Sequence, residues 1–233
     1  HEFQHCVSMN TKQIRQGTFA GTSDNSAIDE GRSTLCEDLL GYGLAPAVGG
    51  QGNNFLFRSC RSFLQNPSRQ GIFQFDGNLD GYGRDYTVMR YLFDRFGQTQ
   101  YRNYVQSTGV GLAQLNASYP GFSSIFGEWA LANLSTSLSG PVPNTLRFGP
   151  SYDPTGTYDI RELGITSLPG WTPRQVASPP SGSQSASLPA WSAASIEYVN
   201  GDGDTLNINL QGPGGLGGSV LVQSPRGTFN GLR

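Results

Sequence analysis

The chain has 233 residues, of which 36% are hydrophobic and 14% charged, and its formal net charge is −2. This charge balance provides no basic surface for nucleic acid or for an anionic membrane. No apolar run approaches the roughly 20 residues that are needed to span a bilayer. The 32 glycines and 14 prolines indicate many turns, in one large domain or in one domain with a small second one.

The chain opens with His1-Glu2-Phe3-Gln4-His5, which has the spacing HExxH. In a helix predicted over residues 1–11, positions i and i+4 lie on one face, so both imidazoles can reach the same cation. Zinc binds imidazole nitrogen readily, and its catalytic sites keep one position open. Glu2 would lie beside that position and act as general base and then as general acid. Both histidines of the chain fall within this motif, which favours a zinc site over a chance match.

Several further helices are predicted from apolar residues at helical spacing. Asp24 or Ser26 could cap the first of these further helices, and this helix is expected to end near residues 41–43. A glycine-rich loop is expected over residues 71–82, followed by a helix that ends at Gly97. The other helices are expected near residues 54–64, 99–107, 110–117 and 122–138.

Helical periodicity is absent after residue 140, where Pro, Gly, Ser and Thr dominate. Strands are predicted near residues 195–199, 205–210 and 219–223, the first two around an acidic turn that also resembles a weak calcium loop. The predicted fold class is therefore α+β, with a mainly helical lobe and a β-rich C-terminal region. We expect three parts: a zinc-binding helical lobe at 1–140, an irregular and β connection at 141–184, and a β-rich accessory domain, complete or truncated, at 185–233.

The third zinc ligand has to be an acid or a cysteine, because the chain has no third histidine. The acids that follow the motif are Asp24, Asp29, Glu30, Glu37 and Asp38. Glu30 and Glu37 are seven residues apart and share a helix face, so one could bind the metal while the other supports a histidine. The cysteines, Cys6, Cys36 and Cys60, form no CxxC pair and are expected to be small buried residues, with one disulfide between helices left open.

The segment Asp29-Glu30-Gly31, with Glu37 seven residues after Glu30, resembles the gluzincin zinc peptidases, in which the ligand glutamate stands in an Asn-Glu-Gly sequence. The segment 82–97 is similar to the part of the aminopeptidase N family that opens with its transition-state tyrosine. Residues 1–138 as a whole resemble the hyicolysin-type secreted bacterial metallopeptidases. The resemblance includes the segments above and Phe126-Gly127-Glu128-Trp129-Ala130-Leu131-Ala132-Asn133. Over residues 139–233 the resemblance is weak. Because the chain begins within the motif helix, we expect the N-terminal part of the catalytic domain to be missing.

The resemblance implies that His1, His5 and Glu30 hold Zn²⁺, with Glu37 beside a histidine. It also implies that Tyr82 donates a hydrogen bond to the oxyanion, and Tyr86, one turn later, is the competing residue. The expected function is a secreted or cell-surface bacterial metalloprotease that acts on peptides or proteins and not on nucleic acid. Exopeptidase and endopeptidase activity cannot be separated. The alternatives are a non-catalytic surface-binding protein on a peptidase scaffold and an inactive processed fragment.

Overall fold

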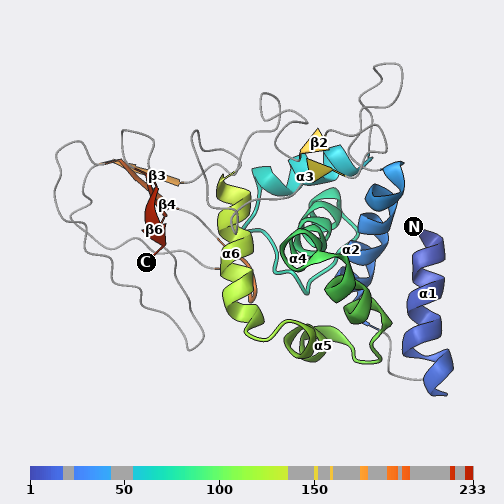
Figure 1. The fold of residues 1–233 in the computed structure, drawn as a ribbon. Coiled ribbons are helices and arrows are strands. Elements are labelled where there is room, and N and C mark those ends of the chain that lie inside the picture. Colours follow the sequence, from blue (N-terminus) through green and yellow to red (C-terminus); the bar gives the residue numbers. More distant parts are fainter. Residues whose placement is uncertain are drawn as a thin grey trace.

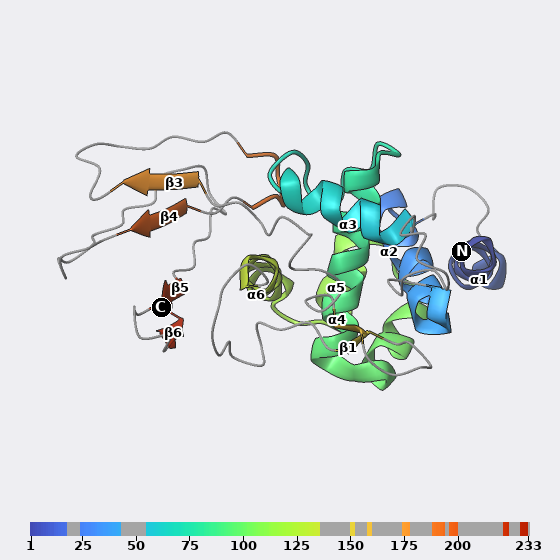
Figure 2. The same cartoon turned by 90° about the horizontal axis from the view of Figure 1, so that it is seen from above.

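The fold is a group of helices arranged around one central helix, α4 (Leu79–Gln106). In the computed structural model, Figures 1 and 2 show this helix surrounded by α2 (Ser26–Glu37), α3 (Phe55–Gln65), α5 (Gly111–Ser118) and α6 (Phe122–Ser135). The motif helix α1 (Glu2–Lys12) lies on the outer side of α2 in both views. The structure describes residues 1–17, 24–42, 55–135, 150–151, 158–159, 174–177, 188–193, 196–199, 221–223 and 229–232.

The helices fall close to the predicted positions, with one revision at α4 that moves a candidate site residue. The glycine-rich stretch predicted as a loop up to Tyr82 is wrong at its end, because α4 begins at Leu79 and Tyr82 lies in its first turn. Gly97 was predicted to end this helix, and it does interrupt the helical geometry with φ of 83°. Helical structure resumes beyond Gly97, and α4 continues to Gln106. Asn25, rather than Asp24 or Ser26, caps α2, and its side chain accepts a hydrogen bond from the Ala27 amide.

A buried charge cluster fixes α4 against the end of α2. Asp38 opens the π-helix η2 (Asp38–Tyr42), which directly follows α2. Its carboxylate accepts hydrogen bonds from the Tyr86 hydroxyl, at 2.9 Å, and from the Arg90 guanidinium, and both donors lie on α4. Arg90 also pairs with Asp94 at 2.7 Å. Arg90 is completely buried, so these two carboxylates balance its charge inside the fold.

Two glycines allow α2 and α3 to approach α4 closely. A methyl group added at Gly31 of α2 would lie 2.5 Å from the backbone oxygen of Asp85 on α4. A methyl group added at Gly83 of α4 would lie 2.1 Å from the backbone oxygen of Ser59 on α3. Both distances are far below van der Waals contact, so any larger residue at these positions would force the two helix backbones apart.

Helix α1 is attached to the fold through polar contacts. Its buried residues are Ser8, Thr11 and Lys12, and none of its residues belongs to the apolar core formed by the described residues. The Lys12 ammonium donates hydrogen bonds to the backbone oxygens of Ser107, at 2.5 Å, and Gly109, at 2.7 Å, beyond the end of α4. The 3-10 helix η1 (Ile14–Gln16) follows α1 and ends at Gly17 in the left-handed conformation.

The predicted α+β fold with a β-rich C-terminal region is wrong for the described residues, which are mainly helical. The strands are β1 (Pro150–Ser151), β2 (Tyr158–Asp159), β3 (Arg174–Ala177), β4 (Ile196–Val199), β5 (Leu221–Gln223) and β6 (Phe229–Leu232). They pair two by two, as β1–β2, β3–β4 and β5–β6, and no pair extends into a larger sheet within the described part. Isolated two-stranded pairs are marginal in water, so they do not amount to the predicted domain.

The structure describes only the first of the two strands of the hairpin that was predicted around residues 200–204. The first strand falls at β4, but β4 pairs in parallel with β3. The turn at 200–204 and the second strand at 205–210 lie outside the described residues. The residue limits predicted for the three parts of the chain stay a prediction. None of the described helices combines the length and the apolar character that crossing a bilayer requires.

We expect Gly31→Ala and Gly83→Ala each to lower the free energy of unfolding by about 1–3 kcal/mol, because the added methyl group overpacks a helix crossing. In an open helix the same change adds about 1 kcal/mol of stability, so the expected sign is reversed. Urea unfolding monitored by circular dichroism measures this difference.

Gly81→Ala is the matched control on α4, since its methyl group would meet side-chain atoms rather than backbone, the nearest being the edge of the Phe75 ring at 3.3 Å. That ring can shift by a small amount, so the control should leave stability nearly unchanged. A stabilising effect of alanine at all three positions would show that the helix crossings are looser than described.

Candidate metal centre

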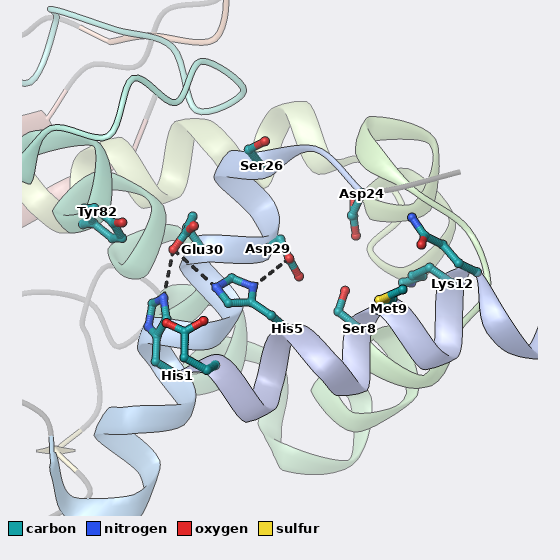
Figure 3. Close-up of a pocket in the computed structure, with 12 residues that line it drawn as sticks. His1, His5, Ser8, Met9, Lys12, Asp24, Ser26, Asp29, Glu30 and Tyr82 are labelled. Carbon is teal, nitrogen blue, oxygen red and sulfur yellow. Dashed lines mark hydrogen bonds and ion pairs between the residues drawn. The ribbon is translucent and has the colours of Figure 1, made fainter. Parts of the chain in front are cut away.

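The two histidines of the HExxH motif, His1 at the N-cap of α1 and His5 one turn later, point towards α2. The two imidazole rings of His1 and His5 are 4.8 Å apart between centroids and meet edge to face. Glu30, on α2, points at both of them, and Figure 3 shows the three side chains converging. The Glu30 Oε2 atom lies 3.0 Å from His1 Nε2 and 3.7 Å from His5 Nε2. One ligand atom from each of the three residues fits within a span of 4.8 Å.

The other ring nitrogen of each histidine contacts a second carboxylate. His1 Nδ1 lies 3.0 Å from Glu37 Oε1, and His5 Nδ1 lies 2.8 Å from Asp29 Oδ2. An ionised carboxylate only accepts hydrogen bonds, so in a neutral imidazole this contact places the proton on Nδ1. With the proton on Nδ1, the Nε2 lone pair of each histidine faces Glu30, and that of His1 lies only 3.0 Å from Oε2. A cation bound between these atoms would relieve the repulsion between the lone pair and the carboxylate. This is the orientation in which histidines bind metal ions with support from neighbouring carboxylates.

These residues fit a zinc ion by the chemistry of their donors. Two imidazole nitrogens and one carboxylate oxygen form a donor set used by catalytic zinc sites, which leaves a fourth position open. The three side chains are between 19% and 25% exposed, so an ion and a small ligand can reach them. They line one end of a cavity of about 460 Å³. The other residues that line it are Glu2, Ser8, Met9, Lys12, Gln13, Asp24, Ser26, Asp29 and Tyr82.

The electrostatics of the cluster also favour a cation. Burial raises the pKa of Glu30; the charge of His5 opposes this shift, while the nearby carboxylates of Asp29, Glu2 and Glu37 add to it. Burial likewise raises the pKa of Glu37; the charge of the N-terminal ammonium opposes this shift, and the carboxylate of Glu2 adds to it. Four carboxylates therefore share a small, partly desolvated volume with two imidazoles, and a divalent cation would relieve their mutual repulsion.

Tyr82 lies at the same end of the cavity, in the first turn of α4. Its ring centroid is 6.4 Å from that of His1, and the rings of Phe55 and Phe75 hold it edge to face at 5.0 and 4.9 Å. Burial, followed by the carboxylates of Glu30, Glu2 and Glu37, raises the pKa of Tyr82 above its ordinary value. The hydroxyl therefore stays protonated at neutral pH and can donate a hydrogen bond.

The remaining candidates differ in their relation to the cavity, because Tyr86 and Asp38 lie outside it whereas Asp24 and Glu2 line it. Tyr86 is fully buried and donates its hydroxyl to Asp38, so neither lies in the cavity. Asp24 forms a buried ion pair with Arg32 at 2.8 Å. Glu2 is exposed and lines the cavity, as expected of a residue that would act on a bound substrate.

Asp29 has a role that the sequence did not reveal, because it supports His5 rather than competing with Glu30 as a ligand. The available signal was its position one residue before Glu30, in the first turn of α2. The cysteine prediction is correct for Cys60, which is buried, and wrong for Cys6, which is exposed; all three thiols are free.

No protein-family model, curated protein or solved structure matches this chain. The functional assignment consequently depends on the geometry of the cluster and on the resemblance of its sequence motifs.

The variants Glu30→Gln and Glu37→Gln should distinguish the residue that binds the metal from the residue that orients a histidine ligand. We expect Glu37→Gln to weaken zinc binding by about 10–100-fold, as the loss of a group that orients a ligand does. Glu30→Gln replaces the charged carboxylate ligand itself with a neutral amide, which is a weaker zinc ligand, and should weaken binding by more. Competition with a chromophoric chelator measures both affinities.

Glu128→Gln is the control, because Glu128 contacts Tyr91 and Arg95 and does not line the cavity. A larger loss for Glu37→Gln than for Glu30→Gln would mean that Glu37 is the zinc ligand.

Proposed function

We propose that this chain is a zinc-dependent peptidase of the gluzincin type, which hydrolyses peptide bonds with the help of Glu2. The observation that carries the proposal is the pair of imidazoles whose Nδ1 atoms contact carboxylates while both Nε2 atoms face Glu30. The same cavity is lined by an exposed glutamate and a tyrosine, the two groups that peptide hydrolysis needs beside a metal.

His1, His5 and Glu30 would hold the zinc ion. When bound, the ion makes water more acidic and polarises the carbonyl group of the substrate. Glu2 follows His1 directly on α1 and is not engaged by any ion pair among the described residues. Its carboxylate would take a proton from the attacking water and then pass it to the leaving nitrogen.

Tyr82 would stabilise the negative charge that develops on the former carbonyl oxygen. Its hydroxyl is neutral at pH 7, so it donates a hydrogen bond without a counter-charge. The contacts with Phe55 and Phe75 restrict the ring before the substrate arrives. Because the ring is held in advance, little reorganisation is needed in the transition state.

The substrates proposed are peptides or proteins. The resemblance to hyicolysin-type peptidases supports a bacterial protein that is secreted or attached to the cell surface. The low content of charged residues agrees with an extracellular protein.

Metal content and the Glu2→Gln variant together test the proposal. The purified protein should bind about one zinc ion per chain, lose peptidase activity on chelation and regain it with zinc. Glu2→Gln keeps the shape of the side chain but removes the proton acceptor. We expect it to retain zinc while peptide cleavage falls by at least about 100-fold.

Zinc binding without cleavage in the wild-type protein would favour a non-catalytic binding protein. Absence of zinc binding would remove the proposed site, and near-normal cleavage by Glu2→Gln would remove Glu2 from the mechanism. The same assay on a longer form of the chain separates an inactive fragment from an inactive protein.

Tyr82→Phe should lower kcat by roughly 10²–10³-fold and leave zinc affinity unchanged, because it removes one donor to the oxyanion. Steady-state kinetics on a chromogenic peptide measures the change.

Tyr86→Phe is the matched comparison one helical turn away. It removes the hydrogen bond to Asp38, so it should cost about 1 kcal/mol of stability and leave kcat nearly unchanged. The opposite result, with kcat lost at Tyr86 and retained at Tyr82, would contradict the assignment of the oxyanion donor.

A further inference from the structure

A buried arginine lies directly behind one of the two histidines of the proposed zinc site. Arg32 is on α2, two residues after Glu30, and only 1% of its side chain is exposed. It does not line the cavity. We propose that Arg32 is a positioning residue, which orients His5 through Asp29 and thereby sets the metal affinity of the site. The inference rests on the proposed function.

The two oxygens of Asp29 divide their contacts between the histidine and the arginine. Oδ2 lies 2.8 Å from His5 Nδ1, and Oδ1 accepts a hydrogen bond from Arg32 Nη2 at 3.1 Å. Asp29 and Arg32 are three residues apart on α2, so the helix itself brings them together. Asp29 is 27% exposed and could otherwise turn towards solvent. Its contact with Arg32 keeps Oδ2 directed at the histidine.

Arg32 is in turn held at a fixed position by other buried groups. Its Nη2 atom forms an ion pair with Asp24 Oδ2 at 2.8 Å and donates to Ser8 Oγ at 2.9 Å. Asp24 Oδ1 accepts hydrogen bonds from two backbone amides, those of Asn25 at 2.9 Å and of Gly111 at 2.8 Å. The Arg32 network, defined as Asp24, Arg32 and Asp29, therefore connects His5 to the start of α5.

The cost of burying Arg32 points to a role beyond packing. Its Nε and Nη1 atoms are buried and have no hydrogen-bond partner among the described residues, while the guanidinium lies over the ring of Tyr104 at 5.8 Å. All of its polar contacts pass through Nη2, the atom that serves Asp29. Unsatisfied buried donors are destabilising, and such costs are concentrated at functional sites.

Two substitutions at Arg32 test the inference by zinc affinity. Arg32→Met removes the charge and keeps a long apolar side chain, and it should weaken zinc binding by about 10–100-fold. Arg32→Lys keeps the charge, but its side chain is one bond shorter and does not bring a nitrogen to the position of Nη2 between Asp24 and Asp29. It should weaken binding by about tenfold, the low end of such effects, and it is the variant to measure if Arg32→Met does not fold.

A double-mutant cycle separates action through Asp29 from a general loss of stability. If Arg32 acts through Asp29, the variant Asp29→Ala/Arg32→Met should bind zinc no more weakly than Asp29→Ala alone. Additive losses would overturn the inference. Glu128→Gln is the control here as well, because Glu128 contacts neither the cavity nor the Arg32 network, and it should leave zinc affinity unchanged.

The tautomer of His5 provides a second measurement that requires no metal. The chain has two histidines, so ¹⁵N-labelled imidazoles give two sets of signals. In the metal-free protein His5 should carry its proton on Nδ1, and this preference should be lost in the Arg32 variants. His1, supported by Glu37, is the internal control and should not change.

The outcomes distinguish the inference from the proposed function. A wild-type protein that binds no zinc removes the proposed metal site, while the His5 tautomer still tests the Arg32 network. Unchanged zinc affinity and an unchanged His5 tautomer in the Arg32 variants would overturn the inference and leave the zinc site standing.

Discussion

The contact between α1 and α2 depends on charges and hydrogen bonds rather than on apolar side chains. It consists of histidine–carboxylate pairs and the hydrogen bond from Arg32 to Ser8, and the far end of α1 is anchored by Lys12 on two carbonyl oxygens beyond the end of α4. Each such contact has a modest net value, since water competes for the same groups. A metal ion bound between the helices would therefore add a large share of the energy that holds α1 in place.

The position of the proposed site is determined by the packing of α2 against α4. Gly31 lets α2 lie directly against α4, and Asp38, paired with Arg90, fixes the end of the same helix. Glu30 is therefore carried by a rigid element, and α1 supplies the histidines to it. Tyr82 comes from α4 itself, and α2, which carries Glu30, packs directly on α4. The same central helix therefore positions both Glu30 and the proposed oxyanion donor.

The sequence was sufficient where a short local pattern determines geometry, as in the spacing of His1 and His5 or the helical periodicity of residues 54–64 and 122–138. It was insufficient where the tertiary structure decides. Glycines near Tyr82 suggested a loop, yet Gly83 serves a close helix crossing and the helix begins earlier. The support of His5 by Asp29 requires knowledge of how α1 and α2 face each other. Beyond residue 140, short alternating runs predicted a β-rich region that the described residues do not form.

X-ray absorption at the zinc edge of the metal-loaded protein tests the central claim most directly, because it reports the atoms around the ion itself. The account predicts two imidazole ligands, with nitrogen and oxygen neighbours at about 2.0–2.2 Å and no sulfur. A sulfur neighbour at about 2.3 Å would place a cysteine such as Cys6 at the metal and contradict the account, as would a single imidazole.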